Sequence, residues 1–148
     1  MKVAYSSLED FRTRTDWLRC TKSWNNAGPR QDCILLESTQ RNPRIARLRL
    51  ILRCRLMLTD TEFDLILIQP FERSNWQPQT VFRGCRVFNT SETLQLVSPS
   101  EIIRGACMCP VFDQTEDVEG QFYLMDSVGG GDMFLRLNGW SVPELLSR

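Results

Sequence analysis

The feature that most constrains the fold of this chain is the run Ile45–Leu58, in which apolar residues alternate with arginines. Every even position of the run is apolar, and four odd positions carry arginine, namely Arg47, Arg49, Arg53 and Arg55. Alternation with a period of two is the pattern of a β-strand with one buried face, whereas a helix would spread the arginines around its circumference. The length of the run predicts one long bent strand, or two strands joined by a bulge.

Shorter strand patterns, separated by polar turns, surround this run. We expect strands over 32–37, 63–69, 81–88, 94–97, 105–112 and 121–125, with Pro70 ending the second of them, and helical turns near 99–104, 132–137 and 141–146. A length of 148 residues is usual for one domain, and long amphipathic helices are absent. The pattern predicts one mainly β domain over 1–148, a barrel or a sandwich, with a β core of about 17–137 and peripheral termini, residues 1–19 being irregular or briefly helical.

The alternation also assigns the buried side of the long strand. Its even positions should face the core, together with the central strand Phe63–Gln69, which is apolar on both faces. The residues that we expect to be largely buried are Leu48, Leu50, Leu52, Cys54, Ile66, Ile68 and Cys107. Because a register shift of one residue would exchange the two faces, the burial of these residues tests the assignment directly.

The absence of histidine excludes the commonest catalytic arrangements. Neither a Ser-His-Asp triad, nor a Cys-His pair, nor a histidine-bound zinc ion can be built from this chain. The glycines Gly129–Gly131 precede an aspartate instead of the lysine of a phosphate-binding loop, so they predict a turn. The acidic residues of 113–119 lack the spacing of a calcium loop. We therefore expect no catalytic residue, no metal and no cofactor.

The six cysteines are expected to be free thiols. They are Cys20, Cys33, Cys54, Cys85, Cys107 and Cys109, and most lie in apolar runs, where a thiol packs as a small apolar side chain. Cys107 and Cys109 could bind zinc together with Cys85 and another cysteine, but zinc sites usually have CxxC spacing. Because the chain shows neither a signal-peptide pattern nor an apolar run long enough to span a bilayer, we expect an intracellular protein without disulfides.

Charge is distributed unevenly along a chain whose net charge is zero. Residues 1–55 hold two Lys and ten Arg against five acids, a net charge of +7, and residues 56–148 hold six Arg against thirteen acids, a net charge of −7. Alternate residues of a strand stand about 7 Å apart, close to the spacing of phosphates along a nucleic-acid strand. The arginines Arg44, Arg47, Arg49, Arg53 and Arg55 are therefore candidates for binding nucleic acid. The alternative is that acids of the second half neutralise them within the fold.

Two tryptophans, Trp24 and Trp76, lie in polar segments that read as loops. Exposed loop aromatics are common in binding modules, where they stack on bases or surround a methylated ammonium group. We take both as candidates for ligand binding. The alternative is that each folds back over the core.

Three short motifs follow one another in a characteristic order. They are Pro29-Arg30-x-Asp32-Cys33, Ala46-Arg47-Leu48 and Asp132-Met133-Phe134-Leu135-Arg136. Their order resembles a domain at the C-terminal end of fungal transposon proteins of the Plavaka and Kyakuja-Dileera-Zisupton group, over most of residues 17–137. The separated acidic residues of a transposase nuclease core are lacking, so the resemblance implies an accessory domain or a fragment of such an element.

A second set of segments points to a related family. It consists of Asp32-Cys33-Ile34, Ile45-Ala46-Arg47-Leu48, Ile103-x-Gly105-x-Cys107 and Phe134-Leu135-Arg136. In this order they resemble a bromo-adjacent homology (BAH) domain, which implies a distorted β-barrel with short helical turns and a role in reading chromatin or docking on proteins. The W-x-x-R-P segment typical of that family is replaced by Gln69-Pro70-Phe71, so no aromatic cage is carried over.

Together these features predict a non-catalytic, BAH-like interaction module of a transposon-derived, nuclear protein. Its expected partner is a protein or a histone tail, and no membrane is involved. The alternative is a β-barrel that binds nucleic acid without sequence preference through its arginine-striped strand. A continuous positive face would favour nucleic acid, whereas dispersed, ion-paired arginines would favour protein docking.

Overall fold

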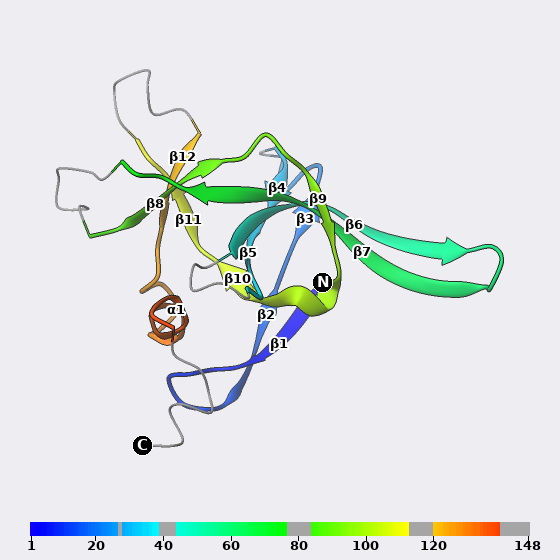
Figure 1. Cartoon of the computed structure of the whole chain (residues 1–148), viewed down its shortest axis with the longest axis horizontal. Helices are drawn as coiled ribbons and strands as arrows, with labels where there is room; N and C mark the ends of the chain where they lie inside the picture. The colour runs from blue at the N-terminus through cyan, green and yellow to red at the C-terminus, as the bar shows by residue number, and fades with distance from the viewer. Residues whose placement is uncertain (27, 39–43, 77–83, 113–119, 140–148) are drawn as a thin grey trace.

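The computed structural model describes residues 1–26, 28–38, 44–76, 84–112 and 120–139 (Figure 1). In these ranges the chain is mainly β, as expected, and its principal sheet curves into a nearly closed, distorted barrel. Three segments discussed above lie wholly or partly outside the described residues: the start of the expected strand 81–88, the acidic residues of 113–119 and the expected helical turn at 141–146. The elements are β1 (Lys2–Ser6), β2 (Thr13–Trp17), β3 (Cys20–Thr21), β4 (Arg30–Gln31), β5 (Cys33–Leu36), β6 (Arg44–Leu56), β7 (Thr61–Arg73), β8 (Arg86–Thr90), β9 (Gln95–Val97), the 3₁₀ turn η1 (Pro99–Glu101), β10 (Ile102–Ala106), β11 (Met108–Pro110), β12 (Gln121–Leu124) and α1 (Asp132–Leu137).

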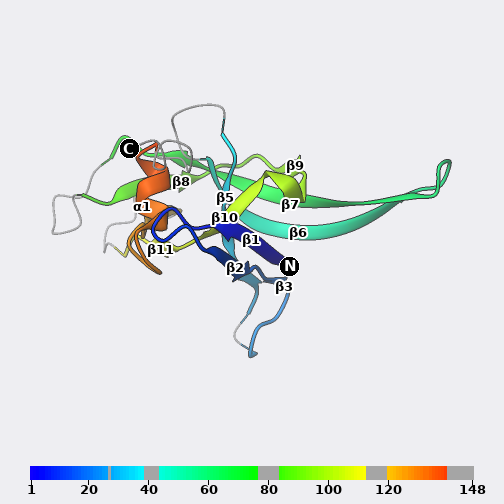
Figure 2. The same cartoon turned by 90° about the horizontal axis from the view of Figure 1, so that it is seen from below.

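The principal sheet is built around the long hairpin of β6 and β7. Its strand order is β10-β5-β6-β7-β8-β12-β11, with β9 paired to part of β7. The two ends of this order, β10 and β11, are consecutive in the chain and are separated only by Cys107. A bend of the chain at Cys107 therefore brings the two ends of the sheet together. Beyond the body of the barrel, β6 and β7 continue as a projecting two-stranded ribbon (Figures 1 and 2).

The centre of the sheet is buried on both faces. One cluster contains Ile34, Leu36, Ala46 and Leu48 with Ile66, Ile68, Val97, Ile102 and Leu18, and the other contains Leu35, Ile45, Phe71, Phe88 and Leu124 with Met133 and Leu137 of α1. Neighbouring residues of β5 and β6 thus belong to different clusters, as the alternation of side chains along a strand requires.

The expected core is only partly correct. Leu48, Ile66 and Ile68 are fully buried, as predicted. Leu50 is 45% exposed, Leu52 and Cys54 are half-buried and Cys107 is exposed, so the prediction was wrong for these four. The first three belong to the projecting ribbon, and Cys107 lies at the bend between β10 and β11.

Two further expectations about single segments were wrong. Residues 1–19 are not irregular or helical but contain the antiparallel hairpin of β1 and β2. Pro70 does not end its strand, because β7 continues to Arg73. Pro70 is the last β7 residue opposite β6, facing Ala46, and the next residue, Phe71, already pairs with β8. The missing amide hydrogen of Pro70 therefore falls where β7 changes its partner.

A buried carboxylate joins the beginning of the described chain to its end. Asp132 is 2% exposed, and its carboxylate accepts hydrogen bonds from the Leu8 amide (2.6 Å), Arg104 Nη1 (2.7 Å) and Arg136 Nε (3.0 Å). The Arg104 guanidinium also lies over the Tyr5 ring, 4.6 Å from its centroid. Asp132 begins α1 without capping it, since the cap position is Gly131. Burial opposes ionisation, but the three hydrogen bonds outweigh it and lower the pKa of Asp132.

The described helix is far too short to reach across a bilayer, and no other described segment forms a long apolar helix.

The 3₁₀ turn η1 confirms the helical turn expected near 99–104, and it begins with a capping box formed by Ser98 and Glu101. At the expected glycine turn, Gly129 and Gly130 adopt positive φ values of 81° and 108°, a region that glycine enters without strain.

We predict that Asp132→Asn destabilises the fold by about 3 kcal/mol, because it removes the nearer of the two carboxylates that compensate the buried Arg104 and leaves only Asp16, at 3.6 Å. The pKa of Asp132 is lower in the folded than in the unfolded chain, so its contribution is fully present above the unfolded value near 4 and is lost as pH falls through the lower folded value. Urea unfolding at neutral and acid pH measures the effect, and the difference between wild type and variant should shrink in acid. Asp64→Asn, which removes an exposed carboxylate, is the control and should change stability little. A difference that is independent of pH would contradict this account.

Candidate functional site

The projecting ribbon begins at a bulge in β6. Leu48 pairs with Ile68, but Leu50 pairs with Leu67, so Arg49 has no residue opposite it and the register shifts by one. Because directly opposed residues share a face, Leu50 lies on the face opposite to that of Leu48. The bulge thus reverses the two faces of β6. We call the ribbon beyond the bulge, residues 50–67, the arm.

One face of the arm is apolar. Three cross-strand pairs, Leu50–Leu67, Leu52–Leu65 and Cys54–Phe63, share this face with Leu56. Leu96 of β9, which pairs with Leu67, extends it sideways. We call the set Leu50, Leu52, Cys54, Leu56, Phe63, Leu65, Leu67 and Leu96 the leucine face.

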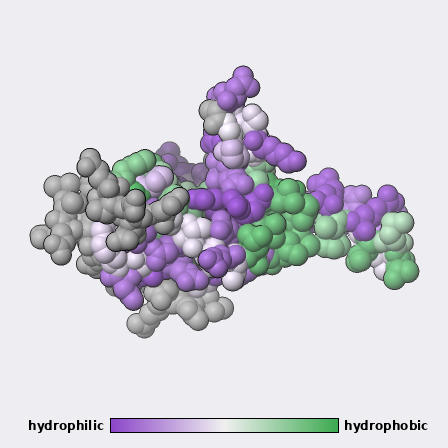
Figure 3. All heavy atoms as spheres, turned by 90° about the horizontal axis from the view of Figure 1, so that it is seen from above, coloured by the Kyte–Doolittle hydropathy of each residue, from purple (hydrophilic) through white to green (hydrophobic). Residues whose placement is uncertain are grey.

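The leucine face is open to solvent. Leu50, Leu56 and Leu96 are 45%, 51% and 58% exposed, and neighbouring apolar residues are exposed as well, with Leu94 beside β9 and Met57 and Leu58 at the tip of the arm. Figure 3 shows hydrophobic residues gathered where the arm leaves the body and again at its tip. A large contiguous apolar patch that is exposed on a folded protein usually marks an interaction site.

The opposite face of the arm is charged and internally paired. Arg53 lies opposite Asp64 and donates two hydrogen bonds to its carboxylate, at 2.9 and 3.3 Å. Arg55 forms an ion pair with Asp60. The hydrogen bond from Arg53 lowers the pKa of Asp64, which keeps the carboxylate ionised. The arm is therefore an amphipathic ribbon with one charged and one apolar face.

The five candidate arginines do not form one continuous face. The bulge places Arg47 on one side of the sheet and Arg53 and Arg55 on the other, so the expectation of a single arginine face was wrong. Each of the five has a partner: Arg44 pairs with Glu101 (3.2 Å), Arg49 donates to Gln31 (2.6 Å), Arg47 lies over the rings of Phe71 and Phe122, and Arg53 and Arg55 are paired as described.

The two candidate tryptophans lie apart from the leucine face. Trp24 is 37% exposed, and its ring lies against the guanidinium groups of Arg19 and Arg30, at 5.0 and 4.7 Å from the centroid. These cations take up the ring surface that an aromatic cage would offer to a cationic ligand. Trp76 is 40% exposed and directly precedes the undescribed residues 77–83, so the structure assigns it no ligand.

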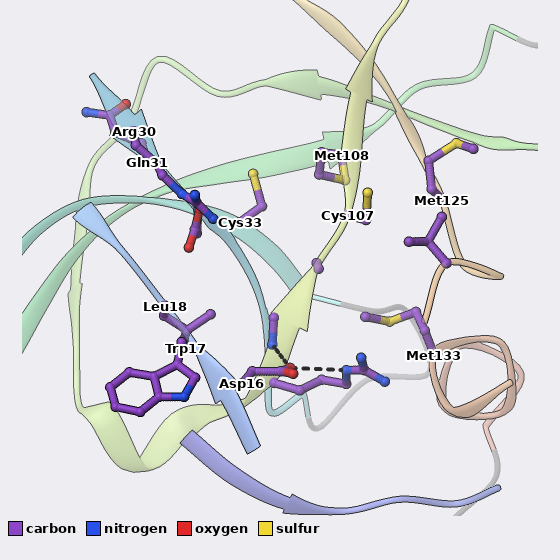
Figure 4. Close-up of a pocket in the computed structure, with 15 residues that line it drawn as sticks. Asp16, Trp17, Leu18, Arg30, Gln31, Cys33, Cys107, Met108, Met125 and Met133 are labelled. Carbon is purple, nitrogen blue, oxygen red and sulfur yellow. Dashed lines mark hydrogen bonds and ion pairs between the residues drawn. The ribbon is translucent and has the colours of Figure 1, made fainter. Parts of the chain in front are cut away.

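A cavity of about 440 Å³ opens beside β2, β5, the bend at Cys107 and α1 (Figure 4). Five sulfur-bearing side chains line it, namely Cys33, Cys107, Met108, Met125 and Met133. Its polar side is engaged internally, since Asp16 accepts a hydrogen bond from the Gly105 amide (2.8 Å) and lies 3.6 Å from Arg104 Nε. The methionines give one part of the wall an adaptable apolar surface, and Arg30, Gln31 and Asp32 make another part polar.

All six cysteines are free thiols in the structure. Among the described residues, no three His, Cys, Asp or Glu side chains come together in a group that could hold a metal ion. The thiols differ in environment: Cys107 is exposed, whereas burial raises the pKa of Cys33 to about 11, although the nearby Arg47 opposes this shift.

We predict that Cys107 reacts with an alkylating reagent well before Cys33. With a pKa of about 11, Cys33 holds roughly one part in a thousand as thiolate at pH 8, and only the thiolate is nucleophilic. Timed labelling with N-ethylmaleimide, followed by mass spectrometry of the peptides, measures the order. In denaturant the two thiols should react at similar rates. Labelling of Cys33 first in the native protein would contradict the raised pKa of its thiol.

The chain matches no family model, no curated protein and no solved structure at a significant level. The resemblance of its motifs to known families therefore stays a prediction.

Proposed function

We propose that this chain is a non-catalytic interaction module that docks on another protein through the leucine face. The observation that carries the proposal is an amphipathic arm whose apolar side is open to solvent while its charged side is internally paired. Covering Leu50, Leu56 and Leu96 would remove apolar surface from water without burying a charge, which favours association.

The arginines support protein docking over nucleic-acid binding. A nucleic-acid interface needs cations that face the same way and are free to contact phosphates. Here Arg44, Arg53 and Arg55 are already paired with carboxylates, and Arg47 lies over two aromatic rings. Transfer to a phosphate backbone would first have to break these contacts.

A transposon origin, a nuclear location and a chromatin or histone-tail partner are further parts of the proposal, and they rest on the resemblance of the motifs alone. The apolar character of the leucine face supports a partner that presents an apolar strand or helix. The sulfur-lined cavity adds a second place for an apolar side chain. The absence of histidine and the internal engagement of Asp16 and Asp32 support a role without catalysis.

We predict that the leucine face selects apolar peptides. A random peptide library displayed on phage is selected on wild type and counter-selected on the double variant Leu50→Ser/Leu96→Ser. Because alternate residues of a strand share one face, the enriched peptides should carry large apolar residues at alternate positions. The double variant Phe112→Ser/Phe134→Ser, which changes exposed aromatics elsewhere, should retain binding. Enrichment of basic peptides, or equal binding by all proteins, would contradict the proposal.

We also predict weak nucleic-acid binding that does not depend on the arginine strand. In gel-shift titrations at two salt concentrations, Arg49→Gln/Arg53→Gln/Arg55→Gln should bind like Arg12→Gln/Arg14→Gln/Arg73→Gln, which removes the same charge elsewhere. If the strand contacted phosphates, each lost contact would reduce the salt slope by about one unit. A reduction confined to the first variant would favour the nucleic-acid alternative.

A further inference from the structure

We infer that the partner of the leucine face is a second copy of this chain, with two arms packed face to face and pointing in opposite directions. This inference rests on the proposed docking role of the leucine face and names its occupant. It would make the protein a homodimer whose two bodies lie at opposite ends of the paired arms.

The arm requires a cover to be stable. From Leu50 to Leu56, β6 pairs only with β7 among the described residues, and from Thr61 to Leu65, β7 pairs only with β6. An isolated two-stranded ribbon is marginally stable in water, and open strand edges beside apolar side chains promote association. A second arm laid on the leucine face would supply the packing that the first arm lacks.

The area of the apolar surface suits a dimer. Taking about 150 Å² for a fully exposed large apolar side chain, the exposed fractions along the arm and at β9 amount to on the order of 600 Å². A stable interface of standard size buries about 800 Å² on each partner. The leucine face together with Met57, Leu58 and Leu94 can therefore form most of such an interface, and the borders of the arm can supply the rest.

In the antiparallel arrangement, the apolar tip of each arm lies against the apolar base of the other arm. Leu94 and Leu96 are exposed at the base of the arm, and Met57 and Leu58, 91% and 99% exposed, at its tip. Seven strand residues from Leu50 to Leu56 span about 20 Å, so the tip of one arm can lie on the base of the other while the bodies stay apart. Such a contact is isologous, since the same patch serves both copies.

Charge does not oppose this arrangement. Every member of the leucine face is uncharged, so neither copy has to bury an unpaired charge in the contact. The ion pairs of Arg53 and Arg55 lie on the outer sides of the two arms and stay in water. The net charge of each chain is zero, so two copies do not repel each other at a distance.

Sedimentation velocity over a range of micromolar concentrations tests the inference. Wild type should dimerise as its concentration rises, and Leu50→Ser/Leu56→Ser/Leu96→Ser should raise the dissociation constant at least roughly a hundredfold. The control Phe112→Ser/Val128→Ser/Phe134→Ser changes apolar residues away from the arm that are at least half exposed and should dimerise like wild type. If the triple variant of the arm fails to fold, the single variant Leu96→Glu replaces it.

Two results would overturn the second copy as partner: a wild type that stays monomeric at every concentration, or a dimer that persists in the variant of the arm. Binding of the dye anilinonaphthalene sulfonate distinguishes these two results from a failure of the proposed docking role. A monomeric wild type that binds the dye, with binding lost in the triple variant, leaves the docking role standing with another partner. A monomeric wild type that does not bind the dye contradicts both the docking role and the second copy as partner.

A cross-linking experiment tests the direction of the arms. A photoreactive residue replaces Met57, and chains labelled with ¹⁵N are mixed with unlabelled chains so that contacts between copies can be recognised by mass. Antiparallel packing predicts cross-links from position 57 to residues 94–96 of the other copy. Cross-links mainly between the two tips would show that the arms are parallel and would overturn this geometry.

Discussion

The bulge at Arg49 is the constraint on which the surface of this protein depends. Up to Leu48, the even positions of β6 pack into the core, and beyond the bulge the even positions form the leucine face. Without it, the leucines of the arm would continue the buried face, and Arg53 and Arg55 would lie beside Arg47. The alternation alone makes the arm amphipathic, and the single unpaired residue decides on which side of the sheet each of its two faces lies.

Local patterns predicted the strands well and the register poorly. The alternation of β6, the doubly apolar β7, the turn η1 and the helix α1 could all be read from neighbouring residues. The bulge could not, because its place depends on where β5 and β9 flank the hairpin, and these contacts join distant parts of the chain. The hairpin of β1 and β2 escaped prediction for a similar reason: Thr13–Trp17 has a polar sequence, and β1 supplies its pairing.

The candidate site was predicted less well than the fold. The sequence directed attention to the arginines of β6, which are paired within the molecule, whereas the surface that we propose for docking is formed by its leucines. One signal could have indicated the arm: a strand of thirteen residues exceeds the usual three to ten, so part of it had to extend beyond the body. The sequence left open whether Trp24 is exposed or folds back over the core, and its contacts with Arg19 and Arg30 depend on the pairing of β3 with β4.

The hydrogen bonds of Asp132 impose an order on folding during synthesis. The hairpin of β6 and β7 joins residues close in sequence and can form while translation continues, whereas Leu8 and Asp132 are 124 positions apart. Until the ribosome has released α1, Arg104 lacks the carboxylate of Asp132 and has only Asp16, at 3.6 Å, as a counter-charge, so the contact that buries β10 against α1 cannot yet form. The leucine face of the arm is therefore formed before the barrel closes, and a nascent chain exposes it during the interval in which the rest of the molecule is still open.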